Sequence, residues 1–453
     1  MDTLSEKLIG LNHRSMEDRD LSRAPLHLLD WLGTVLAARN SAAALALSGG
    51  PTGLDTAFGV TGTPEAAAFQ LGALGNLLEM DDLHRASILH AGDTVWASAL
   101  ALATRRNIDG ATLLRAGLAG YETALRIGRA AARGGYSNWY NSGTCGVYGA
   151  AAASARILAL SLPQTADALG HAGMQAAGLW QCRLEGGEGK QLAMAHAARA
   201  GVTSACVAHA GARGPREILE GRLGFFETFY PAADPDEVLE NPDSEWLLHD
   251  VSFKPWPACR HTHPAIAAAL SLRNTGLSAS TISDVKIITY DAALTFCNNA
   301  APNTAHEARF SLQTAVAIAL CKGAPRIADF EDPTRRDATD VAHLRQRITL
   351  VSDPAMTAAF PDRYAARVEV QTMAGKTLSA DAPHAPGDPE APLSEADLCA
   401  KFLNNAAYAR IARPAAQTLI TAILELPEAK DLTDLRGALS RLSSPLSQLR
   451  SSA

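Results

Sequence analysis

Acidic and histidine side chains gather in one short stretch of the sequence. Glu79, Asp81, Asp82, His84 and His90 lie within twelve positions, in a region that is otherwise apolar. Burying such groups without partners costs on the order of several kcal/mol each, so we expect them to line a cleft or form a polar network. A solvated helix end is the alternative. A metal site is a weaker one, because this order of carboxylates and imidazoles matches neither a zincin motif nor an EF-hand loop.

A second candidate is the segment YNSGTCG at residues 140–146, which directly precedes an alanine-rich stretch. Glycines and hydroxyl residues at the start of a helix leave backbone N–H groups pointing outward, and such a position suits a carboxylate or a phosphate. An ordinary helix N-cap is the alternative. Under the first interpretation, Thr144 and the amides that follow it are the candidate contacts.

A third candidate is Lys190, which follows the glycine-rich residues 186–189. The segment superficially resembles a phosphate loop, but the first glycine of such a loop would fall at Leu184, and Gln191 replaces the required Ser or Thr. Glu188 would also repel a phosphate, so we exclude a nucleotide site. A lysine at the start of a helix can still bind a carboxylate, or act as a base once it is desolvated. A surface lysine is the alternative.

The fourth candidate is the segment KPWPACRHTHP at residues 254–264. Arg260, His261 and His263 lie between prolines at a predicted domain junction, which is a preferred place for ligand pockets. The two histidines could bind zinc, but no cysteine or carboxylate partner has the right spacing nearby. Cys259 lacks the flanking pattern of a thiol protease, so a nucleophilic role is not supported.

The first half of the chain must position most of these residues, and its pattern is helical. Pro25 is a residue with which a helix can begin, and leucines follow it at helical spacing. Paired glycines at residues 134–135 and 186–187 mark breaks. Alanine- and leucine-rich segments predict further helices over residues 97–105, 111–133, 147–160 and 190–210.

The pattern changes after about Trp256. Residues 285–290 and 365–372 alternate as strands with one buried face do, and Ala374-Gly375 offers a turn into a hairpin partner. A helical stretch begins near Phe310, and a capping box at Ser394 opens a last helical pair. The predicted fold is mainly α, with a large all-helical domain and a smaller inserted α+β lid domain. Its predicted parts are residues 1–254 (helical), 255–390 (lid) and 391–453 (helical return).

Composition narrows the class of protein. The 453 residues exceed what one hydrophobic core usually serves. A net charge of -7 argues against nucleic-acid binding, which needs a basic excess. The most apolar stretch, residues 149–160, contains Ser154 and Arg156, so we expect no membrane span. Seven scattered cysteines without a CxxC pair, and an acidic N-terminus without a signal pattern, indicate a cytoplasmic protein.

Together and in this order, six segments resemble the MmgE/PrpD family, which includes 2-methylcitrate dehydratase, cis-aconitate decarboxylase and iminodisuccinate epimerase. The resemblance covers nearly the whole chain. The segments that carry it are MDDLHRASILHAG, YNSGTCGVYGAAAASARIL, GKQLAMAHAARAG, KPWPACRHTHPAI, EARFSLQTAVAIAL and GDPEAPLSEADLCAKF.

The resemblance implies a helical domain with a smaller α+β lid, a homodimer, and an active site between the domains. It also implies acid–base chemistry beside a carboxylate of a small polycarboxylate substrate, without a cofactor. By position, Asp81, Asp82, His90 and Lys190 match active-site residues of the family, and residues 259–263 match its lid-side segment. In this scheme Asp81 joins the catalytic residues, and Asp82, His84, Thr144, Arg260, His261 and His263 bind the substrate.

The chain also departs from the family pattern. Leu83 stands where the family usually has threonine, Ala91 follows His90 in place of proline, and Tyr140 replaces a histidine. We expect His90 or Lys190 to be the base, and Tyr140 to return a proton from the opposite face of the substrate carbon. This arrangement favours an epimerase of an iminodisuccinate-like dicarboxylate. A hydro-lyase or decarboxylase acting on a tricarboxylate is the alternative, and a metal-dependent helical hydrolase is a remote one.

Overall fold

The computed structural model describes residues 2–47, 62–133, 135–185 and 187–442, and the chain divides into two compact units. The larger unit contains residues 1–77, 81–251 and 395–453, and the smaller one contains residues 78–80 and 252–394. The sequence predicted boundaries after residues 254 and 390. It did not anticipate that Leu78–Met80 would group with the smaller unit.

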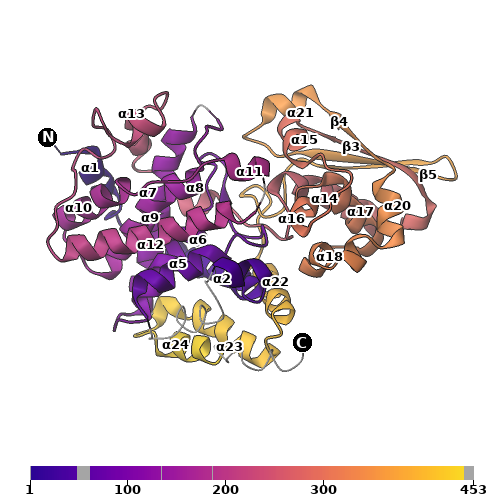
Figure 1. The fold of residues 1–453 in the computed structure, drawn as a ribbon. Helices are drawn as coiled ribbons and strands as arrows, with labels where there is room; N and C mark the ends of the chain where they lie inside the picture. Colours follow the sequence, from indigo (N-terminus) through magenta and orange to yellow (C-terminus); the bar gives the residue numbers. More distant parts are fainter. Residues whose placement is uncertain (1, 48–61, 134, 186, 443–453) are drawn as a thin grey trace. The chain divides into compact units, whose positions relative to one another are not determined.

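The larger unit is built from helices, which confirms the mainly α fold class (Figure 1). None of the helices in the described ranges is long and apolar enough to cross a membrane. The four helices predicted between residues 97 and 210 are present, with ends that differ by a few residues. Its helices are α1 (Leu4–Leu11), α2 (Asp18–Ala38), α3 (Ala42–Leu47), α5 (Pro64–Leu74), α6 (Gly92–Ala103), α7 (Gly110–Ala132), α8 (Asn141–Thr144), α9 (Gly146–Ile157), α10 (Leu162–Gly173), α11 (Gln181–Glu185), α12 (Gly189–His209), α13 (Phe225–Phe229), α22 (Glu395–Tyr408), α23 (Arg413–Leu424) and α24 (Thr433–Ser440), with the 3-10 helices η1 (Pro235–Leu239), η2 (Leu247–Asp250) and η5 (Leu426–Glu428).

Small residues let the central helices of this unit approach closely. α7 and α9 meet at Gly120 and Gly149, where a Cβ added to Gly149 would lie 2.7 Å from the carbonyl oxygen of Gly120. α9 and α12 meet at Ala150 and Gly201, where a Cβ on Gly201 would lie 2.4 Å from that of Ala150. Because such distances are steric overlaps, both crossings depend on glycine. Figure 1 shows these three helices side by side.

The start of α2 corrects one detail of the sequence prediction. The helix begins at Asp18, so Pro25 lies inside it rather than at its first turn. Glu17 and Asp20 form a capping box, which starts the helix seven residues before the proline. A proline inside a helix removes one backbone hydrogen bond, and here the proline is buried. His27 therefore lies in the middle of a long buried helix.

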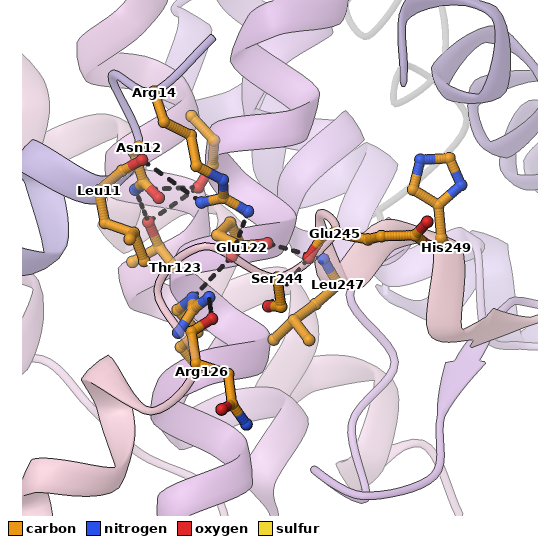
Figure 2. Close-up of polar contacts among 12 residues, drawn as sticks. Leu11, Asn12, Arg14, Glu122, Thr123, Arg126, Ser244, Glu245, Leu247 and His249 are labelled. Carbon is orange, nitrogen blue, oxygen red and sulfur yellow. Dashed lines mark hydrogen bonds and ion pairs between the residues drawn. The ribbon is translucent and has the colours of Figure 1, made fainter. Parts of the chain in front are cut away.

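Two buried charged residues on α7 anchor the chain segment between η1 and η2 (Figure 2). Arg126 Nε donates to Glu122 Oε1 at 2.6 Å, and Arg126 Nη1 donates to the carbonyl oxygen of Glu240 at 2.8 Å. Glu122 Oε2 accepts the backbone N–H of Leu247 at 2.8 Å, and Arg14 binds Oε1 at 2.8 Å. Removing Glu122 would leave the buried charge of Arg126 without its carboxylate partner. The network holds α7 in place, and α7 also contributes to the candidate site.

The smaller unit contains a four-stranded sheet in the order β4-β3-β5-β6. β3 runs parallel to β4 and antiparallel to β5, and β5 and β6 form an antiparallel hairpin. α14 and α17 supply much of its apolar core. The strands are β3 (Ile282–Thr289), β4 (Ile348–Ser352), β5 (Ala366–Thr372) and β6 (Thr377–Ala382); the helices are α14 (His263–Asn274), α15 (Asp291–Cys297), α16 (Ala305–Arg309), α17 (Leu312–Lys322), α18 (Ile327–Glu331), α19 (Pro333–Arg336), α20 (Thr339–Arg345) and α21 (Pro354–Ala359), with the 3-10 helices η3 (Arg260–Thr262) and η4 (Ala279–Thr281).

The predicted strands and hairpin are present, and Gly375 adopts a φ of 77° in the hairpin turn. The predicted helix near Phe310 is α17, and α22 begins directly after Ser394. Strand β4 was not predicted, because it is short and only its first residue is buried, so its sequence shows no clear alternation.

Candidate functional site

Asp82 is the centre of a buried hydrogen-bond network in the larger unit. It lies just before β1 (Leu83–His84), and 2% of its surface is exposed. Oδ2 accepts hydrogen bonds from the Tyr121 hydroxyl at 2.6 Å and from His27 Nδ1 at 2.9 Å, while Oδ1 accepts the backbone N–H of Gly92 at 3.1 Å. Burial raises the pKa of Asp82 to about 6, and the Tyr121 and Gly92 hydrogen bonds oppose that rise. Above this pH, Asp82 is a carboxylate fixed by three donors.

His27 is a member of this network that sequence reasoning missed. Burial lowers the pKa of His27 well below its usual value, so its imidazole is neutral at neutral pH. Its ring packs edge-on against Tyr121, with 5.4 Å between centroids. Since Nδ1 faces a carboxylate oxygen, Nδ1 carries the proton. A lone histidine on a leucine-rich helix gives no signal that separates it from an ordinary core residue.

His90 and Asp81 form the second part of the network. His90 Nδ1 lies 2.7 Å from Asp81 Oδ2 and 3.0 Å from the backbone carbonyl oxygen of Asp82. Both neighbours are acceptors, so Nδ1 carries a proton and, in the neutral ring, Nε2 carries the lone pair. Asn76 donates to both Asp81 oxygens, at 2.7 and 2.8 Å. The His90 side chain is 12% exposed and that of Asp81 is 1% exposed, so the imidazole is the more accessible partner.

The glycine- and hydroxyl-rich segment lies next to His90. It forms α8 and the start of α9, and Ser142 Oγ accepts the backbone N–H of His90 at 3.0 Å. Thr144 is fully buried, and its hydroxyl lies 2.7 Å from the Tyr230 hydroxyl. The segment thus supports the backbone at His90 through a serine that the sequence did not single out.

Tyr140 is the N-cap residue of α8, at the start of the same segment. Its ring is fully buried and meets the Trp180 ring edge-on, with 4.8 Å between centroids. The hydroxyl donates to the sulfur of Met194 on α12, at 3.1 Å. In this conformation the phenol hydroxyl points at the Met194 thioether.

Lys190 is the second residue of α12 and is partly exposed. The positive charge of Lys190 acts on Asp93, a buried residue of α6. Burial raises the pKa of Asp93 well above its usual value, and Lys190 opposes that rise. The neighbouring Gln191 donates to Asn76 Oδ1 at 3.4 Å. The start of α12 therefore adjoins the Asp81 network.

His84 is directed into a local turn. Its Nδ1 lies 2.8 Å from Ser87 Oγ, and its backbone pairs with Leu89. Burial lowers the pKa of His84 to about 3, and the positive charges of Arg129 and Arg85 add to this shift. His84 is therefore neutral at neutral pH and stabilises the turn that leads to His90.

The predicted histidines and arginine of the smaller unit are also buried. Arg260 forms an ion pair with Asp388, which accepts a hydrogen bond from Ser252 Oγ at 2.6 Å. His261 Nδ1 lies 2.7 Å from the Tyr290 hydroxyl. Burial raises the pKa of Tyr290 well above its usual value, so this phenol stays neutral.

His261 and His263 have different surroundings within that segment. The His261 ring stacks on Phe296 with 4.8 Å between centroids. His263 is the first residue of α14, and its Nε2 donates to the carbonyl oxygen of Ala258 at 3.1 Å. This bond ties the start of α14 to the preceding loop.

Glu79 forms an ion pair within the smaller unit. It belongs to the smaller unit, adopts a φ of 52°, and lies 3.6 Å from Lys254 in an ion pair whose members are both buried. Within the described ranges, no group of three or more His, Cys, Asp or Glu side chains could hold a metal ion.

Comparison with known families gives two matches. Residues 2–238 match the MmgE/PrpD N-terminal domain, and residues 256–426 match the MmgE/PrpD C-terminal domain.

Three curated relatives illustrate the similarity. The cis-aconitate decarboxylase of Mus musculus is 28% identical over 301 residues, which are 64% of this chain and 60% of the mouse protein. The human cis-aconitate decarboxylase is 26% identical over 397 residues, which are 84% of this chain and 80% of the human protein. The 2-methylcitrate dehydratase of Cupriavidus necator is 28% identical over 183 residues, 39% of this chain and 37% of that protein. For the mouse and bacterial proteins, the match spans less than two thirds of the relative.

Proposed function

Because the chain belongs to the MmgE/PrpD family, we propose that it is a lyase that acts on a small tricarboxylate, with His90 as its acid–base group. Loss of CO2 from a cis-aconitate-like substrate is the favoured reaction, and the relatives named cis-aconitate decarboxylase support it. The sequence favoured an epimerase, with the lyase as the alternative. The comparisons support the lyase better, and the epimerase stays an untested prediction.

The observation that carries this proposal is the tautomer of His90. Two acceptors hold its Nδ1–H, so Nε2 is the atom that can exchange a proton with a substrate. His90 is also the more exposed member of a pair whose other member, Asp81, is buried. The arrangement orients the imidazole, and the carboxylate stabilises the imidazolium that forms when Nε2 takes a proton.

The proposed chemistry needs one proton at a carbon beside a carboxylate. When an unsaturated tricarboxylate such as cis-aconitate loses CO2, the electron pair of the broken C–C bond spreads over the adjacent C=C bond. The resulting allylic anion takes one proton from His90 Nε2 at the far carbon, and the double bond moves. Lys190 is the proposed partner for a remaining carboxylate, because it lies beside the network and is partly exposed.

The contacts of Tyr140 weigh against the epimerase. An epimerase needs a second proton donor on the opposite face of the substrate carbon, and Tyr140 was the predicted donor. Its hydroxyl is instead hydrogen bonded to the sulfur of Met194, and its ring is fully buried. Dehydration of a 2-methylcitrate-like substrate is the second candidate, which the bacterial relative supports. There His90 would remove a proton from a carbon beside a carboxylate while a hydroxyl group leaves.

The test is incubation of the purified chain, in deuterated buffer, with cis-aconitate, 2-methylcitrate and iminodisuccinate separately. We expect CO2 release from cis-aconitate, with one solvent deuteron in the product by NMR. New C=C absorbance from 2-methylcitrate alone would support the dehydratase instead. Deuterium exchange into iminodisuccinate without a new product would support the epimerase and contradict the lyase.

His90→Asn tests the assignment of the acid–base group. We expect a loss of kcat of about 100-fold or more, because general acid–base groups contribute that much to rates. His209→Asn, at an exposed position near the end of α12, is the matched control and should keep full activity. A folded His90→Asn protein with kcat near that of the wild type would contradict the assignment.

A further inference from the structure

Asp93 is a wholly buried acid in the first turn of α6 whose position is tightly set. One of its oxygens, Oδ1, accepts the indole N–H of Trp31 at 3.0 Å. A Cβ added at Gly75 would lie 1.6 Å from this oxygen and 2.6 Å from the indole nitrogen. Gly75 therefore leaves the space that the Asp93–Trp31 pair occupies. Such a fixed and wholly buried carboxyl group calls for an explanation of its charge state.

The second oxygen of Asp93 gives that explanation. Within the described part of the chain, no donor group of the protein offers Oδ2 a hydrogen bond. The carboxyl group of Asp81 is close enough to the Asp93 side chain to raise its pKa through a side-chain hydrogen-bond contact. Two carboxylates cannot form a hydrogen bond, because both only accept, so one of them carries a proton.

The proton belongs on Asp93 rather than on Asp81. Asp81 receives N–H donors from Asn76 on both oxygens and from His90 on Oδ2, and these contacts stabilise its negative charge. Asp93 receives a single N–H donor, from Trp31. Burial raises the pKa of Asp93, the negative charges of Asp81 and Asp82 raise it further, and Lys190 opposes them. The hydrogen-bond donors and the neighbouring charges therefore both place the proton on Asp93.

We propose that Asp93 is a neutral carboxylic acid that donates a hydrogen bond to Asp81 and so positions Asp81 against His90. The donated bond orients the Asp81 carboxylate and lowers its tendency to take the proton of His90 Nδ1. Asp93 is thus a positioning residue, which acts through Asp81 and His90 without touching the substrate. The catalytic consequence rests on the proposed role of His90, whereas the charge state of Asp93 can be measured independently of any activity.

The first test is the infrared C=O absorption of a neutral carboxylic acid at pH 8. The carboxyl groups of Asp30 and Asp82, with pKa values of about 6, are then only about 1% protonated, so they contribute little to this band. We expect the band in the wild type and in Asp30→Asn, and its loss in Asp93→Asn. A wild type without the band, or an Asp93→Asn protein that keeps it, would overturn the proposal even if the chain is an active lyase.

The second test compares two substitutions by kcat and its pH profile. In Asp93→Asn the amide can still accept from Trp31 and donate to Asp81, so we expect kcat within about threefold of the wild type and an unchanged profile. Asp93→Ala removes both contacts, and misplacement of Asp81 should lower kcat by about tenfold or more. A folded Asp93→Asn protein as impaired as Asp93→Ala, or with a shifted profile, would show that Asp93 acts in its ionised form. If no substrate reacts even with the wild type, the proposed function fails while the infrared result still decides the charge state.

Discussion

The larger and the smaller unit each bury a charged cluster, and the two clusters differ in their balance of charge. The cluster of the larger unit is rich in acids, and burial raises the pKa values of both Asp30 and Asp82 to about 6. In the smaller unit Arg260 is paired with Asp388, but within the described ranges its Nε and Nη1 atoms have no hydrogen-bond partner. Acids that titrate near neutrality suit proton transfer, and a guanidinium with unused donors suits carboxylate binding. We therefore expect loss of the Asp81 carboxylate in the first cluster to change kcat, and loss of the Arg260 guanidinium in the second to change KM.

The largest expected effect comes from Asp81→Asn. An amide at this position presents an N–H group to His90 or to Asn76, which disfavours the tautomer with the proton on Nδ1. We expect kcat to fall about 100- to 1000-fold with little change in KM, as measured by steady-state kinetics. Asp243→Asn, at an exposed position of the same unit, is the matched control and should leave both constants unchanged. A rise in KM at constant kcat would break the assignment of proton transfer to this cluster.

The next effect is on stability and its dependence on pH. The pKa of Asp30 is raised by burial, with Lys401 opposing, from an ordinary value near 4 to about 6, so the folded state holds the proton more tightly than the unfolded state does. This contribution to stability is complete below pH 4 and is lost as pH rises through about 6. Relative to Asp30→Asn, the wild type should lose up to about 3 kcal/mol of unfolding free energy between pH 4 and 7. Denaturant unfolding of both proteins at several pH values measures this difference in unfolding free energy. Asp243→Asn should follow the wild type, and a difference that is constant with pH would contradict the assignment.

Arg260→Lys should affect binding more than turnover. The lysine keeps a positive charge for Asp388 but removes the planar fork of donors. We expect KM for a tricarboxylate to rise about tenfold, with kcat within about threefold. As a control, Arg367→Lys alters an exposed ion pair of the same unit and should leave KM unchanged. If kcat falls and KM stays constant, the smaller cluster takes part in the chemical step and the contrast between the clusters fails.

The smallest effect is expected for Tyr290→Phe. The substitution removes the hydroxyl that lies 2.7 Å from His261 Nδ1 and keeps the ring in its aromatic surroundings. Loss of one buried hydrogen bond should cost about 1 kcal/mol of unfolding free energy. A KM increase of less than about threefold should accompany it if His261 only assists binding. A much larger loss of kcat would assign His261 a part in the proton transfer instead.

The sequence predicted more of the fold than of the network. Helix periodicity, strand alternation and the turn at Gly375 are local patterns, so the helices, the hairpin and the mainly α class follow from them. His27 and Tyr121 could not be found in this way. They approach Asp82 from α2 and α7, 55 and 39 residues away in the sequence, and each lies in a helix whose pattern indicates only burial.

The resemblance to the family supplied His90, Asp81 and Lys190, but no local pattern could give their contacts. Asn76 is an ordinary polar residue after a helix, yet it holds both oxygens of Asp81. Glu79 shows the opposite case. Proximity in the sequence grouped it with Asp81, whereas its backbone turns at a positive φ and its side chain pairs with Lys254.

The pairing of α2 with α22 sets an order of events during synthesis. The carboxylate of Asp30 contacts Lys401 at 2.5 Å, and these residues are 371 positions apart. Phe402 packs so closely against Gly33 that an added Cβ would lie 3.0 Å from its ring. The first helices emerge from the ribosome long before α22, so this face of α2 stays uncovered until nearly the whole chain has been made. A chain truncated before Glu395 would leave Asp30 without its lysine and the leucine-rich helix without its cover, and such a fragment should be held by chaperones or degraded.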